Sequence, residues 1–156
     1  MRRKDREILD GDRIDEIIRS CDCCRLGFAD GLSCYLVPMN FGYVHRDGQR
    51  FFYFHGAREG RKLELTKKNG VAGFELDTGH GLKEGTAACQ YSYRFQSIVG
   101  SGLIQVVNGG EEKREALRSI MEQYTGRSDW EFPVGAEASV TVLKLTVQEL
   151  SCKEHV

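Results

Sequence analysis

The chain has 156 residues, of which 40% are hydrophobic and 29% charged, with 18 glycines, 2 prolines and 6 cysteines. These values are typical of one globular domain and disfavour a disordered chain or a coiled coil. Lysine and arginine total 22 against 23 aspartate and glutamate residues, so the basic excess typical of a nucleic-acid-binding domain is missing.

Features that would place the chain in a membrane or outside the cell are not found. No apolar run approaches the roughly 18 residues that a membrane-spanning helix needs. The basic start Met1–Arg6 is not followed by the apolar stretch of a signal peptide. Cys21 and Cys24 have the spacing of half a zinc site, but no second pair follows, so we predict no metal site. Cysteines without an export signal favour reduced thiols, and we expect a cytoplasmic protein.

The periodicity of apolar residues predicts the following elements in chain order: a helix over residues 12–20, strands over 23–29, 33–43 and 50–55, a helix over 60–68, strands over 71–76 and 90–107, a helix over 111–124 and a strand over 139–149. We expect one domain over residues 1–156, with a barrel over 23–107 and 139–150. Most strands are neighbours linked by turns, and the main helix comes late. This order predicts a small antiparallel barrel with helices packed outside it.

Several positions carry more specific expectations. Asp12 is expected to cap the first helix. Pro38 cannot donate to a sheet ladder, which places it at an edge or a bulge. Gly100 and Gly102 are expected to form bulges. Residues 77–88 are predicted to form a polar, glycine-rich excursion, and the last few residues of the chain to be loose.

One face of the helix over residues 111–124 is predicted to pack on the core. The residues that share this face are Leu117, Ile120, Met121 and Tyr124.

The stretch Phe54–Leu63 (FHGAREGRKL) leaves an aromatic strand, crosses a loop with two glycines and enters a helix. Glycine lets the backbone approach a ligand closely, and the first turn of a helix presents unpaired N–H groups to an anion. Arg58, Arg61 and Lys62 add three cations within five residues, which suits a phosphate monoester. The P-loop pattern is absent. The alternative interpretation is a solvated, basic helix start.

Two further stretches have both a binding and an ordinary structural interpretation. In Tyr35–Tyr43 (YLVPMNFGY), Pro38 interrupts the ladder and Asn40 offers a donor and an acceptor, so a flat heteroaromatic ligand can dock along this edge. In Gln90–Gly102 (QYSYRFQSIVGSG), alternation places hydroxyls on one face and Arg94 on the other. The alternatives are an ordinary edge strand and a half-buried strand.

In this order, the three stretches resemble the FMN-binding split β-barrel of the pyridoxamine 5'-phosphate oxidase-like superfamily, most closely its nitroimidazole-resistance (Nim-like) branch. The resemblance extends over about residues 4 to 150 and rests on Val37–Tyr43, Tyr53–Ala57 with Gly60–Lys62, Ser97–Gly100, and Tyr124–Gly126 leading to Trp130–Pro133. It implies a mainly β (α+β) fold, a six-stranded antiparallel split β-barrel of Greek-key type with two or three flanking helices. It also implies a homodimer with FMN in two clefts at the subunit interface.

The resemblance assigns roles to individual residues. Arg61 and Lys62 would hold the FMN phosphate, His55 would be the catalytic group near the flavin ring, and Trp130 would cover the site from the neighbouring subunit. The cofactor-binding positions that it implies are Val37, Pro38, Met39, Asn40, Phe41, His55, Gly56, Arg61, Lys62, Arg94, Ser97 and Trp130.

FMN accepts a hydride or single electrons, and a histidine can supply a proton or a positive charge near neutral pH. The resemblance therefore indicates an FMN-dependent, nitroreductase-like oxidoreductase that passes electrons to a small acceptor such as a nitroaromatic. The alternatives are a non-catalytic flavin-binding or sensing module, and the same barrel binding haem or a deazaflavin.

Overall fold

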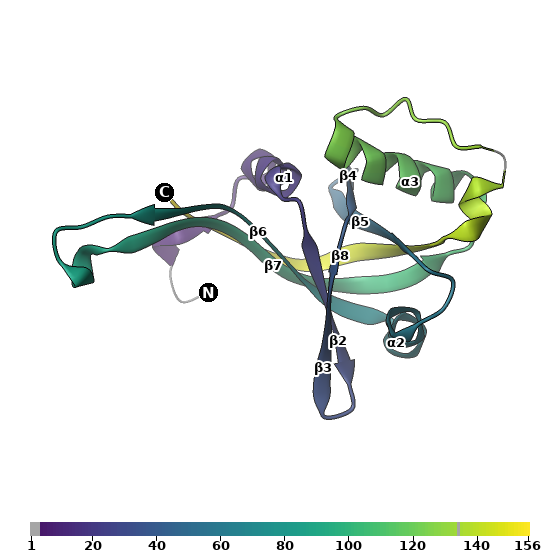
Figure 1. Cartoon of the computed structure of the whole chain (residues 1–156), viewed down its shortest axis with the longest axis horizontal. Coiled ribbons are helices and arrows are strands. Elements are labelled where there is room, and N and C mark those ends of the chain that lie inside the picture. Colours follow the sequence, from purple (N-terminus) through teal and green to yellow (C-terminus); the bar gives the residue numbers. More distant parts are fainter. Residues whose placement is uncertain (1–3, 134) are drawn as a thin grey trace.

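A computed structural model describes residues 4–133 and 135–156 (Figure 1). The first three residues of the basic N-terminal stretch, and one residue of the loop after the last helix, lie outside the described residues. The strands are β1 (Glu7–Ile8), β2 (Cys24–Asp30), β3 (Ser33–Met39), β4 (Gly42–Arg46), β5 (Gln49–Gly56), β6 (Val71–Lys83), β7 (Ser92–Val107) and β8 (Thr141–His155). The helices are α1 (Gly11–Ser20), α2 (Arg61–Asn69) and α3 (Gly110–Thr125), with short 3₁₀ turns η1 (Lys4–Arg6), η2 (Ala88–Gln90) and η3 (Ala136–Ser139). No helix in this part of the chain is long and apolar enough to cross a membrane.

The strands form one antiparallel sheet in the order β3-β2-β6-β7-β8-β5-β4, and β1 pairs with β8. The first and last strands of this order follow each other in the chain, because only Asn40 and Phe41 separate β3 from β4. Since consecutive Cα atoms are about 3.8 Å apart, Met39 and Gly42 lie within about 11 Å of each other. The sheet therefore curls until the ends of its two outer strands meet, which makes a barrel with a break between β3 and β4.

The predicted strand over residues 33–43 is wrong as a single element, because it is two strands. The chain leaves the ladder at Phe41, whose side chain is fully buried in the core. The Phe41 N–H donates to the hydroxyl of Tyr124 at 3.1 Å instead of to a neighbouring strand. The other strand that the prediction missed is β1, which has only two residues and no periodicity of its own.

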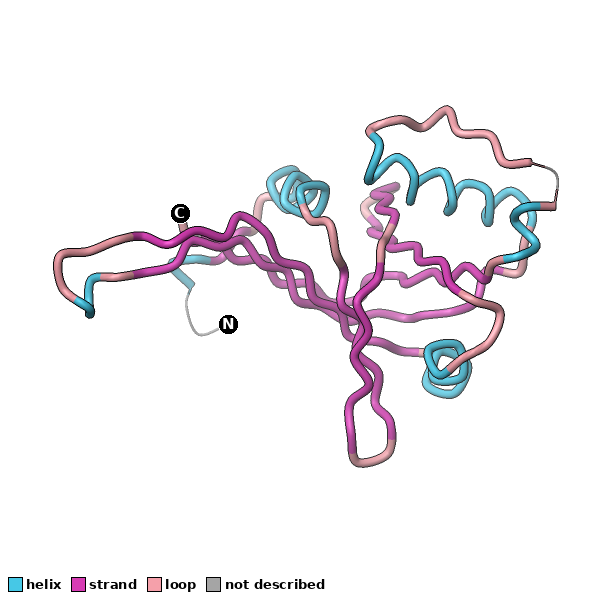
Figure 2. Tube along the Cα trace, viewed as in Figure 1, coloured by secondary structure: helices cyan, strands magenta, loops and turns pink. Residues whose placement is uncertain are grey.

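Two strands run further than predicted. Residues 77–88 are mostly not an excursion, because β6 continues to Lys83 and pairs Leu82 with Tyr93 of β7. These extensions form an arm that projects from the barrel (Figure 2). The C-terminal residues are likewise not loose: β8 extends to His155, which lies opposite Phe95. Alternation of apolar and polar residues could not reveal the extension of β6, because the residues of the arm are partly or fully exposed. The end of β8 does reach the core through the buried Cys152, and pairing with β1 and β7 on its two sides extends the strand.

Glycines in β7 allow strands to cross closely. The pairing of β7 with β8 shifts register at the predicted place, but the extra residue is in the other strand: Ser101 lies opposite Glu149 and Gly102 opposite Val147, which leaves Gln148 of β8 without a partner. A Cβ atom at Gly102 would collide with the backbone of Thr146, and one at Gly100 with the carbonyl of Glu149. The bulge in β8 and these close contacts let the two strands bend while they stay paired.

Aromatic rings fill the inside of the barrel. Phe52 lies at the centre, with its ring centroid 5.0 Å from that of Phe74 and 5.7 Å from that of Phe41. Phe54 is also fully buried. Burying each such ring contributes about 1.5–3 kcal/mol relative to leaving it exposed.

The helices cover the outside of the sheet. Ile14, Ile17 and Ile18 of α1 are buried, as predicted. The predicted cap is wrong by two residues: the side chain of Asp10, not Asp12, accepts a hydrogen bond from the Arg13 N–H at 3.0 Å.

The buried face of α3 also differs from the predicted one. Ala116, Ser119 and Ile120 are buried, whereas Tyr124 is 41% exposed. The reason is a close crossing with β4, where a Cβ atom at Gly42 would overlap the Ser119 side chain and the Ile120 backbone. Small residues must face the sheet there, and the larger side chains lie at the sides of the helix.

A polar cluster fastens α1 to the β4–β5 hairpin. The carboxylate of Asp15 accepts hydrogen bonds from the Tyr43 hydroxyl at 2.7 Å and from Arg50 Nε at 2.9 Å, and it pairs with His45 Nδ1 at 2.6 Å. Burial alone would raise the pKa of Asp15, but the hydrogen bonds from Tyr43, His45 and Arg50 outweigh it and lower the pKa. The folded protein is therefore stabilised by the ionised form of this carboxyl.

We expect Asp15→Asn to lower the free energy of unfolding by about 1–3 kcal/mol at neutral pH, because partly buried donors lose a charged acceptor. A depressed pKa in the folded state stabilises the protein above the unfolded-state value of about 4, and this contribution is lost as the pH falls through the folded-state value. The difference between wild type and variant, measured by urea unfolding, should therefore shrink in acid. Asp12→Asn, an exposed position of the same helix, is the control; equal losses in both variants would contradict the assignment.

Candidate functional site

The segment from Val37 to Phe41 lies at the free edge of the sheet. β3 is the first strand in the order, so among the described strands only β2 pairs with it, and Pro38 lies there opposite Arg25. This position confirms the prediction that the proline occupies an edge. Just beyond it, the side chain of Asn40 is exposed. A pocket of about 270 Å³ opens here, lined by Asp22, Cys23, Pro38, Met39 and Asn40.

The N-terminus of α2 is open to an anion. The helix is capped by Gly60, with φ 125°, and no side chain caps it. The N–H groups of Leu63 and Glu64 bond to the Gly60 carbonyl, whereas the N–H groups of the first helical residues have no partner within a helix. The space where a Gly60 Cβ atom would lie is empty of neighbours. This end of α2 therefore has the properties expected of an anion site.

The two cations at this helix start have different surroundings. Arg61 is exposed, pairs with Asp30 through Nε at 2.7 Å, and stacks over the Tyr35 ring at 5.2 Å. Lys62 is partly buried, and its Nζ donates to Met39 Sδ at 3.1 Å. Burial lowers the pKa of Lys62. A thioether is a weak acceptor, so an anion would be a much stronger partner for this ammonium group.

Gly56 completes the cluster at the end of β5. A Cβ atom at Gly56 would lie 2.7 Å from Lys62 Nζ, so only glycine leaves the ammonium group in place. The preceding residue, His55, is exposed. The structure thus brings Met39, Gly56 and Lys62 together from three elements that are separate in the sequence.

Three of the predicted cofactor-binding residues, Arg94, Ser97 and Trp130, lie outside this cluster. Arg94 and Ser97 belong to the part of β7 that forms the arm and its base. Strand β7 meets α2 at Ile104, whose N–H bonds to the Gly70 carbonyl at the end of the helix. Arg94 lies ten residues before Ile104 in β7, which is a separation of about 33 Å in a straight strand. Trp130 folds back on its own helix, donating to Thr125 Oγ1 at 3.1 Å.

A residue that periodicity assigned to the core, and that the sequence did not list among the cofactor-binding positions, borders this region. Tyr124 contacts Phe41, as described above, and its hydroxyl also donates to the Asp22 carbonyl at 2.9 Å. The available signal was chemical: a tyrosine at a helix end carries a polar tip that needs partners. Periodicity alone counts Tyr124 among the apolar residues of the helix face.

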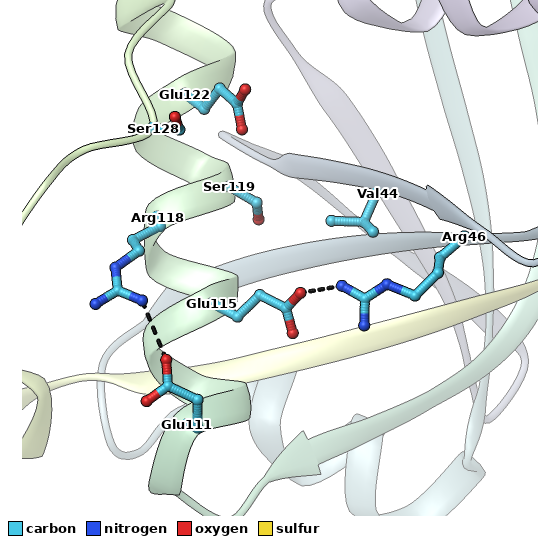
Figure 3. A pocket seen from close by; sticks show the side chains of 8 residues that line it. All are labelled: Val44, Arg46, Glu111, Glu115, Arg118, Ser119, Glu122 and Ser128. Carbon is cyan, nitrogen blue, oxygen red and sulfur yellow. Dashed lines mark hydrogen bonds and ion pairs between the residues drawn. The ribbon is translucent and has the colours of Figure 1, made fainter.

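A second pocket, of about 450 Å³, lies between α3 and β4 (Figure 3). Arg118 pairs there with Glu111 at 3.1 Å, and Arg46 pairs with Glu115. Both arginines are thus neutralised within the chain, and none of the predicted site residues lines this pocket.

The cysteines include both buried and exposed residues. Cys21, Cys24 and Cys152 are buried, and burial raises the pKa of Cys21 to about 12. Their thiols are inert packing groups. Cys34 and Cys89, by contrast, are exposed.

Comparisons with known proteins bear on this geometry. A family model described as pyridoxamine 5'-phosphate oxidase matches residues 10–154. The solved structure of a candidate 5-nitroimidazole antibiotic resistance protein from Bacteroides thetaiotaomicron is similar, with 34% identity and a TM-score of 0.81 over 95% of this chain and 86% of that one. No curated protein matches the sequence.

Two other solved structures share the fold at lower identity. One is a flavocytochrome from Azotobacter vinelandii, 18% identical with a TM-score of 0.80, over 100% of this chain and 72% of that one. The other is an FAD and heme binding protein from Mycobacterium smegmatis, 16% identical with a TM-score of 0.78, over 96% of this chain and 73% of that one.

Proposed function

Since the chain belongs to the pyridoxamine 5'-phosphate oxidase family, we propose that it binds FMN and acts as an oxidoreductase that passes electrons to a small acceptor such as a nitroaromatic. Its fold is the split β-barrel that the sequence indicated. The observation that carries the proposal is the meeting of Met39, Gly56 and Lys62 beside the uncapped start of α2.

The residues at this start suit the phosphate of FMN. Within residues 4–133 and 135–156, the Lys62 ammonium group has a thioether as its only hydrogen-bond partner, and Arg61 offers a planar fork. The unpaired N–H groups of the first helical turn add further donors. Gly56 and Gly60 keep the approach free of side chains. We assign the phosphate to Arg61 and Lys62.

The edge of β3 suits the flat, polar ring system. Val37, Pro38 and Met39 lie on a strand with one free side, and Asn40 presents an exposed amide at its end. Flavin carries carbonyl and ring-nitrogen groups that such an edge can meet. FMN supplies the chemistry, because it accepts a hydride or single electrons. The exposed His55 would supply a proton or a positive charge at neutral pH.

A second copy of the chain is part of the proposal. Arg94 and Ser97 lie along β7 beyond the point where Ile104 bonds to the end of α2, and the arm that carries Arg94 projects away from the barrel (Figure 1). If these residues contact the same cofactor as Arg61 and Lys62, they come from the other subunit of a symmetric dimer. We assign Trp130 to the same subunit-spanning site. Its partial exposure leaves part of the indole ring available to a partner.

The proposed acceptor rests on one similarity. The Bacteroides thetaiotaomicron protein is a candidate 5-nitroimidazole antibiotic resistance protein and is 34% identical to this chain. A nitro group is an electron acceptor of the size that an open edge site admits. This similarity favours a nitroaromatic over pyridoxamine phosphate as the substrate.

We expect the double variant Arg61→Ala, Lys62→Ala to bind FMN at least roughly 100-fold more weakly than wild type, because each charge-assisted hydrogen bond contributes about 1.5–3 kcal/mol. The measurement is fluorescence titration of FMN with purified protein. The matched control is Lys67→Ala, Lys68→Ala, which removes the same charge from exposed positions at the other end of α2 and should bind as wild type does. Equal affinities in all three proteins would remove the phosphate assignment.

Turnover separates an enzyme from a binding module. With FMN-loaded protein, NADH or NADPH and a nitroimidazole under anaerobic conditions, we expect the flavin absorbance to bleach and the nitro compound to be consumed. His55→Ala should keep FMN but lose about 100-fold or more in rate, the contribution typical of a general acid or base. Binding without turnover would favour a sensing module, and a haem spectrum in place of a flavin spectrum would favour haem.

Complementation tests the dimer. One variant carries Arg61→Ala with Lys62→Ala, and the other carries Arg94→Ala with Ser97→Ala. If each site uses both chains, mixed dimers of the two variants contain one intact site, so an equal mixture should recover about one quarter of wild-type FMN sites. No recovery after subunit exchange, in a mixture shown to be dimeric by ultracentrifugation, would place both residue pairs in the site of a single chain and overturn the shared site.

A further inference from the structure

Tyr124, the second-last residue of α3, reaches the break between β3 and β4. Its hydroxyl accepts a hydrogen bond from the Phe41 N–H at 3.1 Å and donates to the Asp22 carbonyl at 2.9 Å. The Phe41 N–H belongs to the peptide unit that joins Asn40 to Phe41, so this hydroxyl holds the two-residue link between β3 and β4. One phenol oxygen therefore ties together the two connections that border the pocket at β3.

The hydroxyl donates and accepts at the same time. A phenol has one proton to donate and two lone pairs to accept with. The Asp22 carbonyl takes the proton, and the Phe41 N–H donates to a lone pair. Partial burial raises the pKa of Tyr124, which keeps the proton in place at neutral pH.

This arrangement fixes the main chain that carries Asn40. Asn40 is exposed and lies in the two-residue link between β3 and β4. Because the Phe41 N–H bonds to Tyr124, the peptide unit that follows Asn40 has a fixed orientation. The backbone that carries the Asn40 side chain at the edge of the pocket is therefore held in place.

We propose that Tyr124 is a positioning residue of the flavin site, which holds the main chain between Asn40 and Phe41, thereby places the Asn40 side chain, and so sets flavin affinity and redox potential. The inference rests on the proposed function. Tyr124 itself acts through Asn40 and the backbone, so a helix on the outside of the barrel controls the polar edge that meets the ring. An ordered group loses less conformational entropy on binding.

The test uses Tyr124→Phe, which removes one oxygen and keeps the ring that packs edge-on against Phe41 with centroids 6.4 Å apart. We expect about tenfold weaker FMN binding, together with a shifted flavin absorption band and a changed midpoint potential. Tyr91→Phe is the matched control, an exposed tyrosine beside η2, and should leave all three unchanged. In the apo-protein, the Phe41 amide hydrogen should exchange with solvent faster in Tyr124→Phe than in wild type.

A double-mutant cycle with Asn40→Ala distinguishes positioning from general loosening. If Tyr124 acts through Asn40, removing its hydroxyl should cost little further affinity once Asn40 is alanine. Fully additive losses, or an unchanged affinity and potential in Tyr124→Phe, would overturn the inference while leaving FMN binding by wild type intact. Failure of wild type to bind FMN would instead overturn the proposed function itself. Asn40→Ala changes only an exposed side chain, so this single variant still measures the contribution of Asn40 to FMN affinity even if Tyr124→Phe unfolds.

Discussion

The two-residue connection between β3 and β4 is the constraint on which the rest of the molecule depends. These strands are first and last in the sheet, so a link of only Asn40 and Phe41 forces the sheet to curl instead of lying open. The buried ring of Phe41 closes the core at this point, while Asn40 is left outside. The main chain has no neighbouring strand there, and an unpaired amide is costly when it is partly buried. Tyr124 supplies the missing acceptor.

The candidate site follows from the same curling. Bringing β3 back to the barrel places Met39 against Lys62, and the end of β5 places Gly56 against the same ammonium group. A partly buried cation whose acceptor is a thioether is held in position but poorly satisfied. Such a group costs free energy in the unliganded protein and interacts strongly with an arriving anion. Arg61 differs, because its pairing with Asp30 fixes α2 to the β2–β3 hairpin and leaves the guanidinium at the surface.

In the proposed dimer, the arm is a second contact region apart from the start of α2. Residues of β6 and β7 beyond the barrel pair with each other but pack on no core, and Tyr93 and Leu82 on them are about half exposed. A two-stranded ribbon is marginally stable by itself in water. Contact with a second copy would cover these side chains and, in the same step, bring Arg94 toward a partner's α2. The proposed dimer thus accounts for both the exposed arm and the separation of the predicted site residues.

The sequence by itself determined the local features: the isoleucine face of α1, the proline at an edge, the bulge near Gly102 and the basic start of α2. Each depends on a few neighbouring residues and on backbone chemistry, so periodicity and residue type suffice. Only the tertiary structure decided where the strand at residues 33–43 breaks, how far β6 and β8 run, and which face of α3 is buried. These outcomes depend on contacts between distant segments, such as Gly42 with Ser119 and Phe41 with Tyr124. Such contacts produce no periodic pattern in the sequence.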